Sequence, residues 1–483
     1  MAALAVFYTW SYFDCLRAFF FLDDFWIIRA TAGIEIHTPL DLLQFFRPVP
    51  PPSFLLYRPI TTVVYFFLLR TLFDYHPVLC HATQLAFHVM NAVLVLGITW
   101  RVVRSLPLAV AAAFIYATAP GHALAVYWIA VFNMTGTAFF YLLALWLWLA
   151  PNGSRRVGSV FVVFIITLLA GEHAVTLPIV LTLTDLLLAP QRNWRRLCRE
   201  QAPFYVVAGA YATAKIYYAR YMLPIPVAAA VSTFYRTTHD PSVILQSLGR
   251  YLGFGLDVAY ALHDADVWPL VVGAALLLAA VASTIVVLSV KAAPRPVRVI
   301  ALGLDVFLVT LGPVLILQDH QQPYYIGIAS VGLSLAVAGL LSSVPLRHGT
   351  AAAMVIALVL SVHVFYIRPL QQQPQIFQLF VGGSETSAGW LYALANAATD
   401  GVSEVVIPEN AVTKSVFELN EAHRFLLCAP YTVRLSANIL TEAPAPGRLI
   451  IPTVTLPRNL PRASRSWASL RRNCRTQRTV PDA

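Results

Sequence analysis

The chain has 483 residues, of which 58% are hydrophobic and 12% are charged, and its formal net charge is +10. Soluble domains carry about twice that charged fraction. Apolar runs such as "WPLVVGAALLLAAVASTIVVLSV" exceed the roughly 18 residues that a membrane-spanning helix needs. The composition therefore excludes an ordinary soluble enzyme and predicts an all-α polytopic membrane protein. The sequence contains no Walker motif and no dinucleotide-binding glycine motif, so we expect no nucleotide cofactor.

Apolar segments taken in chain order predict about eleven transmembrane helices. They cover residues 2–21, 77–99, 106–120, 131–150, 157–171, 174–190, 202–221, 267–290, 297–317, 324–342 and 350–367. The first segment is short and lacks both a basic start and a small-residue cleavage site. We expect an imperfect first span or a true start further upstream, and not a cleaved signal peptide.

Basic residues mark one side of this arrangement. They fall after the second, fourth, sixth, eighth and tenth spans: Arg101, Arg104, Arg155, Arg156, Arg192, Arg195, Arg196, Arg199, Lys291, Arg295, Arg298 and Arg347. The positive-inside rule makes these loops cytoplasmic, which places the N-terminus inside and the C-terminus outside. The positive charge therefore indicates topology, in a bacterial inner or plasma membrane or the endoplasmic reticulum, and we expect no nucleic-acid partner. Lys215 is the exception, a cation within a span that we expect to snorkel outward.

The loops on the opposite side are longer and carry helices of their own. The first, residues 22–76, contains "PLDLLQFF" and "PITTVVYFFLLRTLF", whose initial prolines and apolar patterns predict helices along the membrane surface. A third such helix is expected in "PSVILQSLGRYLGFGLDVAYAL", in the loop from 222 to 266. Residues able to carry chemistry therefore gather on the extracytoplasmic face.

The composition changes after residue 367, where the membrane domain (1–367) ends. Residues 368–460 combine an amphipathic helical pattern with the strand patterns "EVVIPE" and "RLIIPTVTLP". We expect a small extracytoplasmic domain here, with an α/β arrangement as one option. Residues 461–483 are basic and are expected to form a disordered, solvated tail.

Asp23 and Asp24 stand side by side in "FFFLDDFWII", at the end of the first apolar segment. Two adjacent carboxylates in a poorly hydrated place repel each other, which raises the pKa of one of them. Such a carboxylate suits a general base toward a hydroxyl. The alternative is a water-exposed pair that only ends the helix, and the pair by itself favours neither reading. No cysteine spacing predicts a metal site, but a divalent cation joining the two aspartates is left open.

Other outer-loop residues could join this pair. Tyr57 and Arg58 begin a predicted surface helix, and arginine suits the bidentate binding of phosphate oxygens. Glu172 lies in a tight turn between two spans, as a site residue or as a solvated turn residue. The polar and aromatic loop "QDHQQPYY" adds His320, Tyr324 and Tyr325.

One face of the second span is polar. His81, His88 and Asn91 stand at i, i+7 and i+10, offsets that share one side of a helix. We expect His88 and Asn91 to form contacts between helices. His81 is nearer to the outer end, where it would be closer to chemistry.

Five segments in order carry a resemblance to a known family. They are "FFFLDDFWII", "LYRPITTVVYFFLLRTLF", "HPVLCHATQLAFHVMNAVLVL", "GEHAVTLPIVLTLTDLLL" and "QQPYYIGIASVGLSLA". Over roughly residues 1–345 the chain resembles the GT-C glycosyltransferases, particularly the protein O-mannosyltransferases and the transmembrane O-mannosyltransferases that carry TPR repeats.

The resemblance implies a polyprenyl- or dolichyl-phosphate monosaccharide as donor and transfer with inversion to a protein or glycan acceptor outside the bilayer. Asp23 would be the base and Asp24 would support the acceptor. The resemblance gives Arg58, with help from His320, Tyr324 and Tyr325, the donor phosphate, and it makes Glu172 a supporting acid; Tyr57 and His81 would lie beside them. Departures from the family pattern are Pro323 in place of a basic residue, Gly171 in place of lysine, a short first span and no TPR array.

Three other functions remain open on the sequence. A transporter would use charges inside the membrane and internal inverted repeats, whereas the chain shows no clear two-half symmetry and most of its ionisable residues lie at the level of the outer loops. An O-antigen ligase or polymerase would depend on a large late outer loop, whereas here the first loop is the richer one. A non-catalytic membrane scaffold would explain the departures at Gly171 and Pro323.

Overall fold

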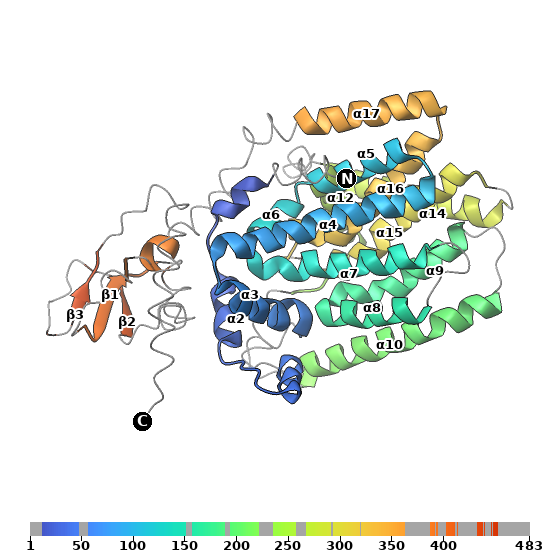
Figure 1. Ribbon diagram of the computed structural model, residues 1–483. Helices are drawn as coiled ribbons and strands as arrows, with labels where there is room; N and C mark the ends of the chain where they lie inside the picture. Colours follow the sequence, from blue (N-terminus) through green and yellow to red (C-terminus); the bar gives the residue numbers. More distant parts are fainter. Residues whose placement is uncertain are drawn as a thin grey trace.

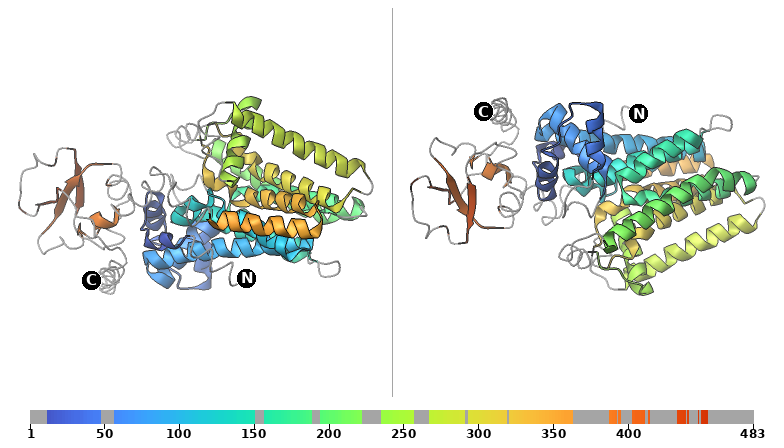
Figure 2. Two further views of the ribbon diagram at one scale, coloured as in Figure 1. Left: turned by 90° about the horizontal axis from the view of Figure 1, so that it is seen from above. Right: turned by 90° about the horizontal axis from the view of Figure 1, so that it is seen from below.

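A computed structural model describes residues 12–47, 57–150, 157–188, 194–221, 235–256, 267–290, 293–318 and 320–362, with shorter segments between 387 and 452. Most of these residues are helical, and the helices run roughly alongside one another in one body (Figure 1). A small sheet lies beyond one end of that body, as all three views show (Figures 1 and 2). The expected basic tail, 461–483, lies outside the described residues.

The first part of the chain forms short helices, which are labelled η where they are 3-10 or π-helical. Their bounds are η1 Phe13–Arg17, α2 Asp23–Thr31, η2 Pro39–Phe46, η4 Pro59–Val64 and α3 Tyr65–Phe73. The long helices follow, with short turns between them: α4 Pro77–Val103, α5 Leu106–Thr118, α6 His122–Tyr127, η5 Ile129–Val131, α7 Phe132–Trp148, α8 Val157–Ala170, η6 Glu172–Thr176, α9 Leu177–Leu188 and α10 Trp194–Tyr221. The remaining helices are α12 Pro241–Leu256, α14 Trp268–Ser289, α15 Arg295–Leu315, η7 Pro323–Tyr325, α16 Ile326–Ser342 and α17 Leu346–Val362.

Among the residues that the structure describes, five helices are long and apolar enough to cross a membrane: Pro77–Val103, Ile129–Trp148, Trp268–Ser289, Arg295–Leu315 and Pro323–Ser342. Each coincides with an expected span. Two more expected spans, over 106–120 and 157–171, appear as apolar helices of 13 and 14 residues. The lengths and compositions are compatible with a membrane protein, and the surface helices expected to begin at Pro39, Pro59 and Pro241 begin at those prolines.

The first expected span differs from expectation where it is described. Residues 13–17 form a single 3-10 turn, the chain is not helical from Ala18 to Phe21, and α2 begins only at Asp23. Leu22 between them has a φ of 45°, in the left-handed region that interrupts a helix. The prediction of a continuous helix up to Phe21 is therefore wrong for residues 12–21, because the chain leaves the helical conformation after Arg17 and becomes helical again only at Asp23.

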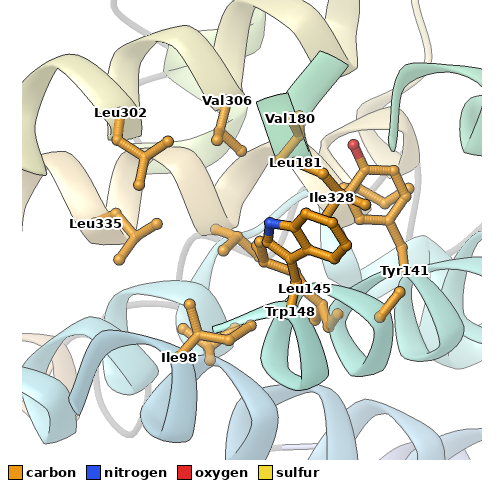
Figure 3. Packing of buried hydrophobic residues seen from close by; sticks show 14 of the residues in the cluster. Ile98, Tyr141, Leu145, Trp148, Val180, Leu181, Leu302, Val306, Ile328 and Leu335 are labelled. Carbon is orange, nitrogen blue, oxygen red and sulfur yellow. The ribbon is translucent and has the colours of Figure 1, made fainter. Parts of the chain in front are cut away.

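The main core lies between the long helices. Trp148 of α7 is fully buried and donates its indole N–H to Asp185 of α9, at 3.1 Å. Around it pack side chains from α7, α9, α15 and α16, among them Tyr141, Leu145, Val180, Leu181, Leu302, Val306, Ile328 and Leu335 (Figure 3). Lipid tails are as apolar as leucine, so helix association in a membrane depends on close packing and on interhelical hydrogen bonds such as this one.

Helices α15 and α16 approach each other at glycine. A Cβ added to Gly303 would clash with backbone atoms of Gly332 and Ala336, and one added to Gly332 would clash with the backbone of Gly303 and Phe307. Small residues at such a contact allow two helix backbones to come close. The pair α15–α16 thereby fixes where the loop between them, residues 316–325, emerges.

The C-terminal sheet has three parallel strands in the order β2-β1-β3, with β1 Glu404–Pro408, β2 Thr432–Ser436 and β3 Arg448–Ile450. The strands expected in "EVVIPE" and "RLIIPTVTLP" are confirmed as β1 and β3. Buried side chains of β1, including Val405 and Ile407, belong to the same apolar cluster as Phe19 and Phe20 before α2. The C-terminal unit therefore packs near the start of α2.

Replacing Gly303 with alanine is expected to lower the free energy of unfolding by about 1–3 kcal/mol, as overpacking does, because the added methyl group meets backbone that cannot move aside. Gly312→Ala is the matched control on the same helix, since nothing lies within 4 Å of its Cβ position. Thermal unfolding of both variants in the same detergent measures the difference. Equal melting temperatures would show that α15 and α16 are not in backbone contact.

Candidate functional site

The residues proposed from the sequence lie at one end of the helical body. In Figure 1, α2, α3 and the sheet are at that end, where α4 and α7 begin. Contacts at the opposite end join the arginine-rich turns: Arg295 donates to the Val102 carbonyl at 3.0 Å, and the Arg101 guanidinium lies 3.9 Å from the Trp146 ring centroid.

Arg58 is positioned by the turn that follows it. Pro59 starts a π-helical turn, and the Thr62 amide donates to the Arg58 carbonyl at 2.9 Å. The Thr61 hydroxyl donates to the carbonyl of Ala170, the last residue of α8, at 2.5 Å. This bond joins the first outer loop to the turn that carries Glu172, although 109 residues separate the two partners.

Glu172 bridges two cations. One carboxylate oxygen accepts a hydrogen bond from Arg58 Nε at 2.6 Å, and the other accepts one from Lys215 Nζ at 2.8 Å. Burial alone would raise the pKa of Glu172, but Arg58 and then Lys215 bring that pKa well below its ordinary value. Burial likewise would lower the pKa of Arg58, yet Glu172 holds it above its ordinary value. Glu172 and Arg58 are therefore charged at neutral pH.

Lys215 does not snorkel outward, as the sequence had suggested. Its side chain is 20% exposed and its ammonium group binds Glu172, with the rings of Tyr57 and Tyr211 at 5.9 and 5.7 Å from Nζ. Gly171, just before Glu172, cannot supply a cation itself. A Cβ at that position would clash with the Thr137 side chain of α7, which gives glycine there a steric reason.

Asp24 is an anchor. It is 1% exposed, and its two oxygens accept hydrogen bonds from the backbone amides of Phe21, at 2.8 Å, and Ala130, at 2.6 Å. Desolvation raises the pKa of Asp24 well above its ordinary value, although these two bonds oppose the shift. The side chain therefore holds the start of α2 against η5.

Asp23, in contrast, points away from these backbone partners. Its side chain is exposed, and no described residue forms a hydrogen bond or ion pair with it. Surrounding protein atoms nevertheless desolvate it enough to raise its pKa. Its charge acts on the phenols of Tyr235 and Tyr324, so the carboxylate lies within electrostatic reach of both rings. The Asp23 carboxylate is therefore open to a substrate.

Tyr235 connects Asp23 to the cations. Burial raises the pKa of its phenol; the positive charge of Arg58 opposes this, and the negative charges of Glu172 and Asp23 add to it. The segment that carries Tyr235 is held against the loop after α15 by two backbone bonds, Thr238 N–H to Ile316 O at 2.8 Å and Gln318 N–H to Arg236 O at 2.9 Å. Sequence reasoning missed Tyr235, and the only available signal was its polar surroundings, "YRTTHD", in an outer loop.

The loop between α15 and α16 adds aromatic rings at this end of the helical body. His320 lies between Tyr235 and Tyr325, with ring centroids 4.8 and 5.9 Å away, and Tyr324 lies 4.9 Å from Tyr325. His173 lies 5.6 Å from Tyr325, and burial lowers its pKa to about 4. Tyr324 and Tyr325 thus lie within electrostatic reach of Arg58, and His320 lies beside Tyr325.

Two other predicted residues have different positions. His81 is fully buried and faces the carbonyls of Phe19 and Val126, away from the Glu172 cluster. Tyr57 is at the edge of the cluster, where its hydroxyl donates to the Phe46 carbonyl at 3.1 Å. Asn91 forms the expected contact between helices by donating to the Thr135 carbonyl of α7 at 3.0 Å.

Comparison with known proteins adds no identification. No protein-family model matches the sequence, and no curated protein is significantly similar to it. Within the part of the chain that the structure describes, no group of three or more His, Cys, Asp or Glu side chains could hold a metal ion.

Removing the charge of Glu172 should destabilise the fold. Glu172→Gln leaves Arg58 and Lys215 facing each other, and we expect a loss of about 1–3 kcal/mol, less than for a fully buried pair because Glu172 is 33% exposed. The pKa of Glu172 is depressed by folding, so its contribution is present above the unfolded pKa of about 4.3 and is lost as the pH falls below it.

Thermal unfolding from pH 7 to pH 3 tests both expectations. The wild-type melting temperature should fall more steeply on acidification than that of Glu172→Gln. Glu35→Gln is the control, since that carboxylate is in the first outer loop and is 73% exposed. Parallel pH profiles for wild type and Glu172→Gln would contradict the ion-pair network.

Proposed function

We propose that the chain is a membrane glycosyltransferase. It would move a monosaccharide from a polyprenyl- or dolichyl-phosphate donor to a hydroxyl of a protein or glycan acceptor, with inversion. One observation carries this proposal: an exposed carboxylate, Asp23, lies at the same end of an apolar helical body as two partly buried cations, Arg58 and Lys215, which Glu172 holds together. The resemblance to GT-C enzymes supports it, because Asp23 and Arg58 come from motifs that carry the resemblance.

The proposed membrane arrangement has about eleven spans, with the site on the extracytoplasmic side. Arginine-rich turns at the opposite end would face the cytoplasm by the positive-inside rule. The C-terminal unit, which packs near α2, would then lie outside with the site. A lipid donor fits such a location, since its chain stays in the hydrocarbon while the sugar phosphate reaches the surface.

The reaction would be a single displacement. The Asp23 carboxylate takes the proton of the acceptor hydroxyl as its oxygen attacks the anomeric carbon. The bond between that carbon and the phosphate oxygen breaks, and the electron pair leaves with the lipid phosphate. Arg58 and hydroxyls of the late-loop tyrosines would stabilise the negative charge that develops there.

Asp24 would contribute by position. Both of its oxygens are occupied by backbone amides, which fixes the first turn of α2 and thereby the direction of Asp23. Asp24 would therefore position Asp23 and would not make the contact with the acceptor that had been expected. Pro323 stands where the GT-C pattern has a basic residue. A cation from another helix lies near this position, since Arg250 of α12 donates to Gln321 Oε1 at 3.0 Å.

Asp23→Asn should abolish most transfer, by about 10²–10⁴-fold, as expected for loss of a general base. Release of sugar from polyprenyl-phosphate mannose and polyprenyl-phosphate glucose by the purified chain in nanodiscs measures it. Glu35→Gln removes a carboxylate from the same loop and should keep full activity. Transfer at the wild-type rate by Asp23→Asn would exclude Asp23 as the base.

The rate should also depend on pH through Asp23. The base works only when ionised, and desolvation raises its pKa, so kcat/KM should increase with pH through a pKa above the ordinary aspartate value of about 4 and then level off. A pH profile of donor consumption measures this. A rate that is flat from pH 4 to pH 7 would contradict the assignment.

Arg58→Ala should weaken donor binding. Loss of a charged hydrogen-bond donor costs about 1.5–3 kcal/mol, which corresponds to a rise of about 10–100-fold in the KM for the donor. Arg47→Ala, on an exposed arginine of the same loop, is the control. Donor kinetics unchanged in Arg58→Ala would remove the phosphate role. Proteoliposome flux of the lipid without sugar release would instead favour a transporter.

A further inference from the structure

We propose that Lys215 is a second cation for the donor phosphate and that Glu172 positions it beside Arg58. This inference rests on the proposed transferase function. The juxtaposition is not visible in the sequence, since Lys215 stands 43 residues after Glu172 and belongs to a different helix. Glu172 would therefore be a positioning residue, because its two oxygens are occupied by the cations.

The hydrogen-bond donors of this cluster exceed its acceptors. The Lys215 ammonium has three N–H donors, of which Glu172 accepts one. Arg58 gives Nε to Glu172, and Nη1 reaches the Asn133 side-chain oxygen at 2.5 Å when that amide is oriented to accept. Among the described residues, Nη2 of Arg58 and the other two ammonium donors meet no acceptor. They are available to oxygens of a bound anion.

The charge also points to an anion. Two cations and one carboxylate leave an excess positive charge, and the side chains of Arg58 and Lys215 are only 13% and 20% exposed. A partly buried, uncompensated charge is costly, and an anion that fits between the cations offsets this cost. Glu172 and Arg58 are the charged groups that act on Lys215, so Asp23 does not supply the missing negative charge.

A buried hydroxyl lies beside the ammonium. The ring of Tyr211 is 5.7 Å from Lys215 Nζ, on the same helix α10. Its hydroxyl is buried and has no hydrogen-bond partner in the described part of the chain. Buried polar atoms are rarely left unpaired. A phosphate oxygen held by Lys215 would give this hydroxyl an acceptor.

The choice of lysine makes the site testable. Only three of the 33 basic residues are lysine, and the other two are Lys291 and Lys414. An ammonium is a compact point charge, whereas guanidinium is a planar fork that needs a different arrangement of acceptors. Lys215→Arg should therefore keep the charge and part of the affinity, and Lys215→Gln should lose both.

Binding of lipids to the purified full chain in neutral nanodiscs tests the proposal. The probes are undecaprenyl phosphate, undecaprenol and inorganic phosphate. Wild type should bind undecaprenyl phosphate far more tightly than the other two, and Lys215→Gln should weaken that binding by about ten-fold or more. Undecaprenol binding should not change. Arg347→Gln, which removes an exposed charge in the first turn of α17, is the control and should match wild type.

A second measurement needs no variant. An amine-acylating reagent should label Lys215 in the free protein, and undecaprenyl phosphate, but not undecaprenol, should protect it. Mass spectrometry of the labelled peptide gives the extent of protection. This keeps the proposal falsifiable if Lys215→Gln fails to fold.

The outcomes separate this inference from the proposed function. Wild-type affinity in Lys215→Gln, or labelling that undecaprenyl phosphate does not reduce, would overturn the role of Lys215 even where sugar transfer is observed. Phosphate-dependent binding and protection without any sugar transfer would support the anion site and overturn the transferase. Inorganic phosphate binding as tightly as the lipid would overturn a lipid donor as the occupant.

Discussion

Glu172 binds Arg58 through one carboxylate oxygen and Lys215 through the other, and this end of the helical body is organised around that carboxylate. Arg58 precedes it by 114 residues and Lys215 follows it by 43. Three separate segments thus meet at one side chain. Because a cation left unpaired in a poorly hydrated place is costly, these segments are held together more firmly than their exposed loops would be by themselves.

The same constraint explains the backbone around the bridge. Thr61 joins the first outer loop to the end of α8, and Gly171 lets the turn pass against Thr137 without a side chain. Asp24 joins two further segments, because its carboxylate accepts hydrogen bonds from the backbone amides of Phe21 and Ala130. These hydrogen bonds pair polar groups within the protein, as an apolar environment requires. The result is that Asp23 is left as the accessible carboxylate of the pair.

This division of roles supports the proposed chemistry. A base must be reachable and capable of ionising, whereas a phosphate site needs fixed positive charge. Asp23 is exposed with a raised pKa, and Arg58 is buried with its charge secured by Glu172. Tyr235 and Tyr324 lie within electrostatic reach of both groups. A lipid-linked sugar placed there would have its phosphate near the cations and its anomeric carbon toward the base.

Much of the architecture could be predicted from the sequence, because apolar length and arginine placement follow directly from the physics of a bilayer. Five expected spans appear as long apolar helices, and the prolines at 39, 59 and 241 start helices where expected. The prediction of a helix up to Phe21 was wrong. The positive φ at Leu22 depends on tertiary contacts, and the hydrophobic periodicity of the sequence does not detect such contacts.

What the sequence by itself determined was the set of candidates: the acidic pair, Arg58, Glu172 and the aromatic late loop. Only the tertiary structure decided their roles. It made Asp24 an anchor, buried His81 away from the cluster, and brought Lys215 and Tyr235 to it from segments with no recognisable motif. The physical reason is that charge pairing and desolvation depend on distances between groups far apart in the chain, and these distances are set by how the helices pack.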